Sequence, residues 1–271
     1  MDAELAVTSI GPEAGSLRGA AFFDLDRTLM EGSSGFHWAR AARRAGLISR
    51  GQLMRDAWAN LKFRLRGSTD SAADAVKRRV ALAIADVPVR DLQRLAPQVL
   101  AGVLPRLYPQ MLAVAYEHQD EGRPIYICTA ASQEMAELLA HVLGFDGGVG
   151  SRSEIVDGRY TGRPAGPFAY REGKAQAMGE LAQRDGIDLG SSYAYSDSES
   201  DLPMLRAVGH PVAVNPDTEL ARVAREEGWE VLRFDRLGRR LKVLAAALAA
   251  AAVGGAGGSV VASRRSGLAR R

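Results

Sequence analysis

The chain has 271 residues, 46% of them hydrophobic and 25% charged, which is ordinary for a globular protein with one large domain or a core domain plus an insertion. Its 35 basic and 32 acidic residues give a formal net charge of only +3, which argues against a basic surface built for nucleic acid. The single cysteine, Cys128, excludes an internal disulfide and fits a reducing compartment.

The first 18 residues lack the basic start and the apolar core of a signal peptide, so we expect a cytoplasmic protein. Gly11-Pro12 and Gly15-Ser16 are typical of loops. We therefore interpret residues 1–18 as a flexible lead-in to the first structural element.

An apolar run from Ala20 to Phe23 predicts a buried strand that ends at Asp24, and Asp26 and Thr28 follow it. Successive residues of a strand point to opposite faces, so the two carboxylates should leave the strand on the same side. At the carboxyl end of a parallel strand, both would project into the crevice where open α/β sheets bind ligands. The plain alternative is a strand followed by an Asp-capped turn.

The next segment, residues 33–107, has a helical pattern that no strand-like alternation interrupts. Gly46 and the run Gly67-Ser68-Thr69-Asp70 are typical of helix ends and caps, and further helices are expected at 73–85 and 91–104. We interpret the segment as an all-helical insertion that closes over the mouth of the sheet and excludes water.

Strands and helices alternate through the remainder of the chain, which is typical of a parallel, doubly wound sheet. Strands are expected at 125–128, 192–197, 212–214 and 230–234, helices at 108–119, 133–143, 173–184 and 201–208, and a β-hairpin at 151–163. The predicted fold class is α/β, with a core domain of residues 19–32 and 108–235, a helical domain of residues 33–107 and a tail of residues 236–271.

Polar side chains recur where these elements meet. Thr129 closes the second strand, Asp197 ends the third, and Asp201 follows four residues later. Lys174, one of only four lysines, opens a helix. Together with Asp24, this set can bind a hard cation and a phosphate, and oxygen-only carboxylate ligands suit Mg²⁺.

Four segments occur in a fixed order over residues 20–205: Asp24-x-Asp26-x-Thr28, Thr129, Lys174 and Asp197-Ser-Glu-Ser-Asp201. In this ordered set the sequence resembles the haloacid dehalogenase (HAD) superfamily, and within it the phosphoserine phosphatase-like branch and the bacterial HAD-IB hydrolases. The resemblance implies a Rossmann-like core with a type I helical cap. It also implies a Mg²⁺-dependent phosphomonoesterase that works through a phospho-aspartate on a small phosphorylated metabolite.

The resemblance also implies a role for each motif residue. Asp24 would be the nucleophile, and Asp26 the general acid and base. Mg²⁺ would be bound by the Asp24 side chain, the Asp26 backbone carbonyl and Asp197. Asp201 would orient these ligands and hold the lysine of the third motif.

The phosphoryl group would be bound by Thr129, the backbone N–H of Ala130 and Lys174. Plainer alternatives stay open at this point for three of the motif residues. Thr129 could cap the helix that follows it, Lys174 could be a surface lysine at a helix start, and Asp201 could be only a helix N-cap.

Phosphoserine is the default candidate substrate, which would imply a role in serine biosynthesis. Two other functions stay open: a phosphatase of a phospholipid-related substrate at the membrane, and a non-catalytic HAD scaffold. The sequence indicates no oligomeric state.

The tail is the only feature that suggests a membrane. Its residues 243–263 are uncharged and long enough to span a bilayer, but only six of them are Leu or Val, which gives a marginal insertion free energy of about −2 to −4 kcal/mol. The alternative is an Ala-rich helix with a basic end that makes weak contact with anionic lipid.

Overall fold

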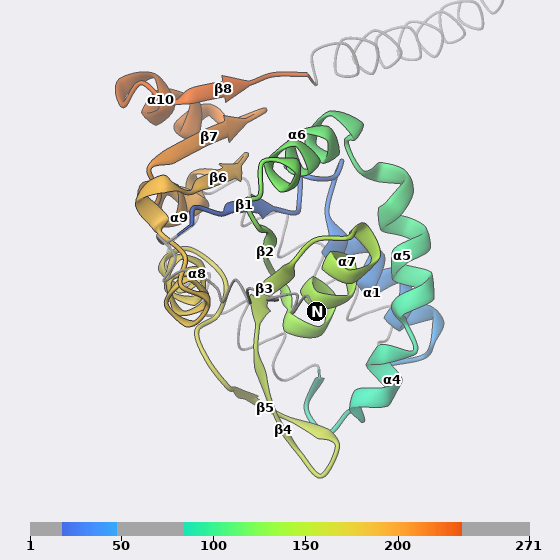
Figure 1. The fold of residues 1–271 in the computed structure, drawn as a ribbon. Helices are drawn as coiled ribbons and strands as arrows, with labels where there is room; N and C mark the ends of the chain where they lie inside the picture. Colours follow the sequence, from blue (N-terminus) through green and yellow to red (C-terminus); the bar gives the residue numbers. More distant parts are fainter. Residues whose placement is uncertain (1–17, 48–83, 235–271) are drawn as a thin grey trace, which may run out of the picture. The chain divides into compact units, whose positions relative to one another are not determined.

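The computed structural model describes residues 18–47 and 84–234, and the described residues up to Val231 belong to one compact unit. The centre of this unit is a six-stranded sheet with the order β3-β2-β1-β6-β7-β8 (Figure 1). Within this sheet, the four strand pairs whose register is defined are all parallel, so the predicted α/β fold is confirmed. The strands are β1 (Ala21–Asp24), β2 (Ile125–Ser132), β3 (Gly147–Ser151), β6 (Tyr193–Ser196), β7 (His210–Val214) and β8 (Glu230–Leu232).

The central strand β1 determines where the polar motif residues lie. It is paired on both sides and buried along its whole length, which is why its sequence is a continuous apolar run up to Asp24. Asp24 is level with Cys128 of β2, and Phe23 is level with Tyr195 of β6. The residues that follow the three strands therefore meet at the same carboxyl edge of the sheet.

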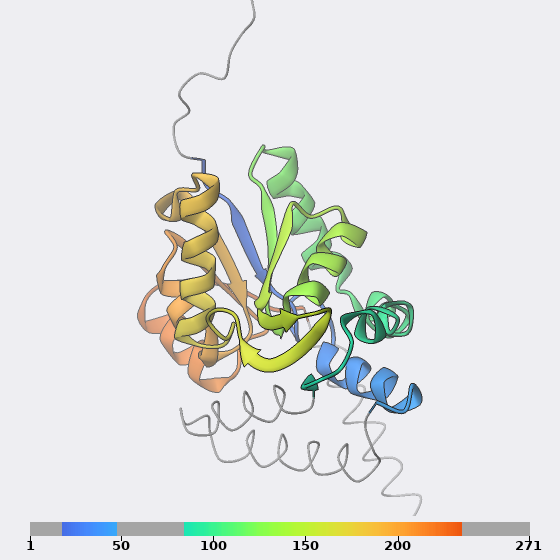
Figure 2. The same ribbon diagram turned by 90° about the horizontal axis from the view of Figure 1, so that it is seen from below.

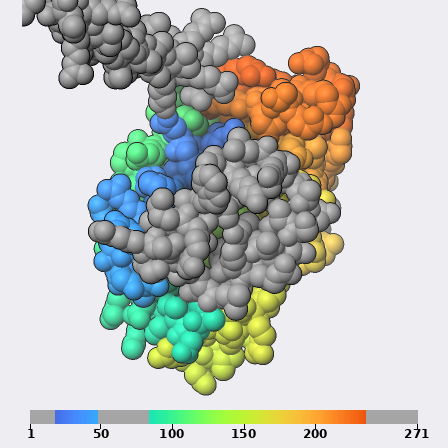
Figure 3. All heavy atoms as spheres, turned by 180° about the vertical axis from the view of Figure 1, so that it is seen from behind, coloured from blue at the N-terminus to red at the C-terminus, as the bar shows by residue number. Residues whose placement is uncertain are grey.

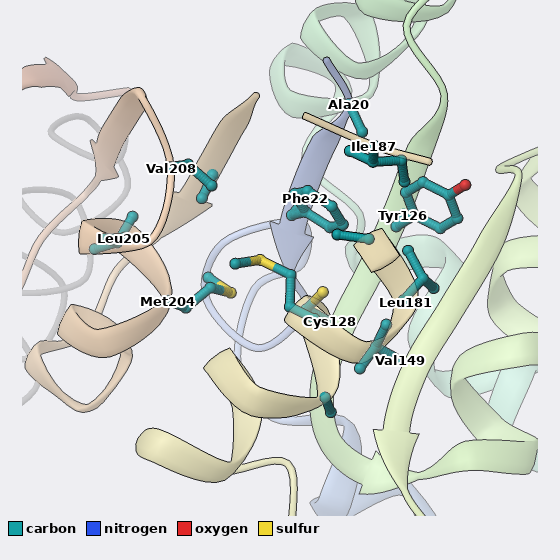
Figure 4. Packing of buried hydrophobic residues seen from close by; sticks show 14 of the residues in the cluster. Ala20, Phe22, Tyr126, Cys128, Val149, Leu181, Ile187, Met204, Leu205 and Val208 are labelled. Atoms are coloured by element: carbon teal, nitrogen blue, oxygen red, sulfur yellow. The ribbon is translucent and has the colours of Figure 1, made fainter. Parts of the chain in front are cut away.

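Helices cover both faces of the sheet. Figure 2 shows α8 (Glu172–Asp185) on one face and α6 (Pro109–Asp120) with α7 (Gln133–Leu143) on the other. The apolar core on the α8 face also includes residues of the short helix α9 (Leu202–Arg206) and of α10 (Thr218–Glu226). There Phe22, Cys128 and Met204 pack together (Figure 4). The neighbouring Phe23 points to the other face and stacks on Tyr195 at 4.5 Å between ring centroids.

Two predicted elements of the core domain are confirmed, and two further elements were not predicted. The helix at 133–143 is confirmed, and Gly144 ends it in the left-handed conformation that glycine favours. The hairpin at 151–163 is confirmed as β4 (Ser153–Val156) paired antiparallel with β5 (Arg159–Pro164). By contrast, β3 and α10 were not predicted.

The segment between β1 and α6 contains helices in both of its described parts, 33–47 and 84–107. These are α1 (Ser34–Arg44), α4 (Val89–Gln93), α5 (Ala96–Val103) and the short 3₁₀ helix η1 (Leu104–Arg106). The single helix expected at 91–104 is wrong, because the structure has α4 and α5 with a break between them. Figure 3 shows the blue residues of α1 beside the teal residues that include α4 and α5. Helices α1 and α5 pack closely, because a side chain at Gly102 would overlap the His37 ring.

Four of the sequence predictions fall wholly or mostly outside the described residues: the lead-in at 1–18 except for its last residue, the helix break and cap at 67–70, the helix at 73–85, and the tail at 236–271 with its uncharged run. Among the residues that are described, no helix has the length and apolar character needed to cross a membrane.

Candidate active site

A buried lysine joins two of the predicted motifs at the carboxyl edge of the sheet. Lys174 lies in the first turn of α8, and its Nζ donates hydrogen bonds to Asp24 Oδ1 at 2.7 Å and to Asp201 Oδ2 at 2.8 Å. The lysine is 2% exposed and both carboxylates are buried. Ser196 at the end of β6 also donates to Asp201 Oδ2, at 2.7 Å. The alternative of a surface lysine is therefore wrong.

The pKa values at this cluster are displaced because charge is buried there. Burial raises the pKa of Asp24 to about 8; Lys174 opposes the rise, and Asp201 and Asp197 add to it. Burial alone would lower the pKa of Lys174, but Asp201 and Asp24 raise it above its ordinary value. The ammonium therefore stays charged between crowded carboxylates.

Asp201 occupies the N-cap position of α9, at the end of the 3₁₀ helix η3 (Glu199–Asp201). Its carboxylate makes no capping hydrogen bond to α9 and binds Lys174 and Ser196 instead. The interpretation of Asp201 as only a helix cap is therefore wrong.

The third carboxylate, Asp197, directly follows β6 and is 3% exposed. Its Oδ2 lies 2.9 Å from Arg27 Nη2, yet this buried oxygen accepts no hydrogen bond of good geometry from the described residues. Burial raises the pKa of Asp197 to about 7, Arg27 opposes the rise, and Asp201 and Asp217 add to it. Asp197 is thus a buried carboxylate that a further cation would stabilise.

Asp26 lies in the turn after β1 and is only partly buried. Ser33 Oγ donates a hydrogen bond to its Oδ2 at 2.7 Å, and the Ser34 backbone N–H donates to its Oδ1 at 2.8 Å. Both donors belong to the start of α1. Asp26 is thus held by the helical segment and not by the Lys174 cluster.

The second motif lies at the end of β2. Thr129 is 3% exposed and its Oγ1 accepts a hydrogen bond from the Ala131 N–H at 3.2 Å. The helix that follows is capped by Ser132, whose side chain accepts from Met135 N, so the alternative of Thr129 as the cap is wrong. Ala130, by contrast, is exposed.

The carboxylates of the site bear on whether it can hold a divalent cation. Within residues 18–47 and 84–234 no three His, Cys, Asp or Glu side chains are grouped as a metal site. The ligand set expected from the sequence needs only two side chains, Asp24 and Asp197, with the backbone carbonyl of Asp26. Asp197 Oδ2 is buried without a hydrogen bond from the part of the chain that the structure describes, and all the expected donors are oxygens, so the residues present fit Mg²⁺.

Three contacts of the site were not predicted from the sequence. Arg27 lies inside the first motif, but its contact with Asp197 depends on a left-handed backbone, with φ of 68°, that a non-glycine residue rarely adopts. Ser33 and Ser196 contact Asp26 and Asp201 through side-chain hydroxyls. The sequence motifs identified the carboxylates and Lys174, but not Arg27, Ser33 and Ser196, which contact the carboxylates.

Comparisons with known proteins agree with this arrangement. Residues 21–206 match the model of the haloacid dehalogenase-like hydrolase family. The chain is 38% identical over 226 residues to phosphoserine phosphatase SerB1 of Mycobacterium tuberculosis, covering 83% of this chain and 73% of the relative. It is 30% identical over 223 residues to a histidinol-phosphatase of Neisseria meningitidis, covering 80% of this chain and all of the relative.

A solved structure also matches the fold. The crystal structure of a Bordetella pertussis protein of unknown function superimposes with a TM-score of 0.70 at 29% identity, covering 80% of this chain and 99% of that one. The family match spans more than half of the chain and includes every motif that forms the buried cluster. The chain therefore belongs to the haloacid dehalogenase-like hydrolase family, as a phosphoserine phosphatase-like hydrolase of phosphoric monoesters.

Proposed function

We propose that the protein is a Mg²⁺-dependent phosphomonoesterase that forms a phospho-aspartate on Asp24 and acts on a small phosphorylated metabolite. The observation that carries the proposal is the position of Lys174, buried between Asp24 and Asp201. A buried ammonium beside the end of a parallel strand places positive charge where a phosphoryl group would bind.

The first step follows from the contacts of Asp24. Lys174 holds Oδ1, so we assign the attack on phosphorus to Oδ2. A bond forms between Oδ2 and phosphorus while the bond from phosphorus to the ester oxygen breaks. Asp26 donates a proton to that ester oxygen, and the alcohol leaves.

The second step reverses the proton's direction. A water oxygen attacks phosphorus, the bond from phosphorus to Asp24 breaks, and Asp26 takes the proton that the water loses. Inorganic phosphate and the free carboxylate of Asp24 result. Thr129 and the N–H of Ala130 would hold the phosphoryl oxygens in both steps.

The cation would be held by Asp24, the Asp26 carbonyl and Asp197, and when bound it would offset the negative charge of the phosphoryl group. Lys174 supplies one fixed positive charge to the same region. Arg27 is a second cation beside the buried carboxylates, through its contact with Asp197.

Phosphoserine is the first substrate to test, because a relative named phosphoserine phosphatase covers 83% of this chain at 38% identity. Histidinol phosphate is the second, because the Neisseria meningitidis relative is matched along its whole length. A phospholipid-related substrate rests only on the tail, which lies outside the described residues. The non-catalytic scaffold is disfavoured by the phosphatases among the relatives.

The test is phosphate release from p-nitrophenyl phosphate, phosphoserine, phosphothreonine, histidinol phosphate, sugar phosphates and lysophosphatidate, with Mg²⁺ or with EDTA. Turnover that requires Mg²⁺ and is lost in Asp24→Asn supports the proposal, and the fastest substrate identifies the pocket's preference. A folded protein without turnover on any of these compounds would contradict it. Asp157→Asn, in the turn between β4 and β5, is the matched control and should keep full activity.

A further inference from the structure

The N-cap residue of α1 makes an unusual contact. A serine at this position ordinarily accepts a hydrogen bond from a backbone N–H in the first turn of its own helix. Ser33 makes no such capping bond. Its hydroxyl donates to Asp26 Oδ2 at 2.7 Å, and the adjacent Ser34 N–H donates to Asp26 Oδ1 at 2.8 Å. The start of α1 therefore holds both oxygens of one carboxyl group.

From this geometry we infer that Ser33 is a positioning residue that fixes the Asp26 carboxyl group for proton transfer. The inference rests on the proposed function, in which Asp26 exchanges a proton with the ester oxygen and with water. A carboxylate has about two acceptor positions on each oxygen. The two donors occupy one position on each, which sets the plane of the carboxyl group and leaves the other positions for the transferred proton.

Among the described residues, loss of the Ser33 hydroxyl would leave a single donor, the Ser34 N–H, on this carboxyl group. One hydrogen bond does not define a plane, so the group could turn about its Cβ–Cγ bond. Asp26 is only partly buried, and neighbouring side chains restrict that rotation less than they would in a core. Proton transfer depends on the alignment of donor and acceptor, so the loss should appear in the step that needs the proton.

The helix that carries Ser33 is itself well anchored. The chain segments entering and leaving the helical region are joined by backbone hydrogen bonds from Glu31 N to Arg106 O at 2.7 Å and from Tyr108 N to Leu29 O at 2.8 Å. Close packing of α1 on α5 at Gly102 adds a second anchor. A donor on a rigid element can hold its acceptor within the narrow range that catalysis needs.

The basicity of the leaving group gives a specific test. An alkyl phosphate releases a strongly basic alkoxide and needs the proton from Asp26, whereas p-nitrophenyl phosphate releases a weakly basic phenolate and needs it little. We expect Ser33→Ala to lower kcat/KM about 10- to 100-fold for the fastest alkyl phosphate of the panel, and several-fold less for p-nitrophenyl phosphate. The ratio kcat/KM is used because it covers the steps up to phosphorylation of Asp24.

Two further variants separate positioning from a structural effect. Ser34→Ala keeps the backbone donor to Asp26 and should keep the wild-type ratio between the two substrates. Ser33→Thr restores a hydroxyl at the N-cap and should recover most of the activity on the alkyl phosphate. Far-UV circular dichroism checks that all three variants are folded.

If Ser33→Ala lowers kcat/KM equally for both substrates, or lowers it for neither, the inference is overturned while the proposed function stays intact. Failure of Ser33→Thr to recover any activity would also overturn it. If the wild-type protein itself releases no phosphate from any substrate, the proposed function fails and this inference fails with it. The two failures are distinguishable, because the first is seen in the wild type and the second only in the Ser33 variants.

Discussion

The two faces of the central sheet bury polar groups in opposite ways. On the α8 face, Lys174 lies between Asp24 and Asp201, and the charges are incompletely balanced. On the α6 face, His118 Nε2 and the Tyr195 hydroxyl are 2.7 Å apart, and Arg123 Nε donates to His118 Nδ1 at 2.8 Å. Because Nδ1 accepts, the His118 ring carries its proton on Nε2 and donates to Tyr195.

The difference is one of charge. Burial lowers the pKa of His118 to about 4, and the nearby Arg123 adds to the fall, so the imidazole is neutral at pH 7. The α6 cluster is therefore a satisfied network that needs no further ligand. The raised pKa values of Asp24 and Asp197 indicate that the buried carboxylates at the carboxyl edge of the sheet lack positive charge, which is the expected condition of a site that binds a cation and reacts with phosphate.

The largest effect should follow from Lys174→Met, which breaks the charged cluster. Two buried carboxylates would lose their counter-ion, so we expect the free energy of unfolding to fall by about 3–5 kcal/mol and kcat/KM to fall by at least about 10²-fold. Urea denaturation and phosphate release measure the two effects. Arg152→Ala, which removes an exposed ion pair with Glu180, is the control and should cost at most about 1 kcal/mol. A denaturation midpoint equal to that of the wild type in Lys174→Met would contradict the buried-pair interpretation.

The next largest effect should come from the opposite face. His118→Ala removes a buried ring and both of its hydrogen bonds, so the free energy of unfolding should fall by about 2–4 kcal/mol. The kcat/KM of the folded protein should not change, because His118 contacts no residue of the proposed site. Measuring both on the same preparation makes the comparison direct. A loss of kcat/KM in the folded variant would show that the two faces are coupled.

The two faces also differ in how well their buried polar contacts could be predicted from the sequence. Asp24, Lys174 and Asp201 stand in an ordered motif set, and the parallel sheet that brings them together was predictable from alternating strands and helices. His118 and Tyr195 carried no such signal, because a histidine near a helix end and a tyrosine in an apolar strand are ordinary residues. Their contact depends on packing between α6 and β6, which periodicity does not specify.

Two of the differences from the sequence prediction have identifiable physical causes. The sequence of β3 begins Gly147-Gly148 and has low β propensity, and glycine is there because a side chain at Gly148 would overlap the Ala136 backbone of α7. The expected helix at 91–104 is broken where Pro97 falls in the first turn of α5, a position that starts a helix and does not continue one. Tertiary contacts and one proline thus decided what the hydrophobic pattern left ambiguous.

A smaller effect should appear when a divalent cation is added. A ligand that binds only the folded state stabilises it by about 2.7 kcal/mol at a concentration 100 times its Kd. We expect Mg²⁺ to raise the Tm of the wild type and of His118→Ala, EDTA to reverse the rise, and Asp197→Asn to lose it. Thermal unfolding followed by circular dichroism gives the result without reference to activity. Equal stabilisation of Asp197→Asn would remove that residue from the cation site.

The smallest expected effect is a pH dependence that belongs to the α6 face alone. The folded-state pKa of His118 is about 4, below the ordinary 6.5, so between these values the unfolded chain binds more protons and acid favours unfolding. The stability that His118 contributes should be complete above pH 6.5 and decline as the pH falls toward 4. Between pH 7.5 and pH 5, the stability difference between wild type and His118→Ala should shrink by about 1–2 kcal/mol.

Comparing the free energy of unfolding of the wild type with that of His118→Ala also cancels the opposing pH effect of the buried carboxylates. Asp24 and Asp197 have raised folded-state pKa values, so the folded chain binds the extra protons there and acid favours folding. Both carboxylates are present in the wild type and in His118→Ala, so their contribution cancels. Urea denaturation of both proteins at the two pH values measures the remainder. A difference that stays constant or grows on acidification would mean that His118 is charged in the folded protein, and the contrast between the two faces would then be lost.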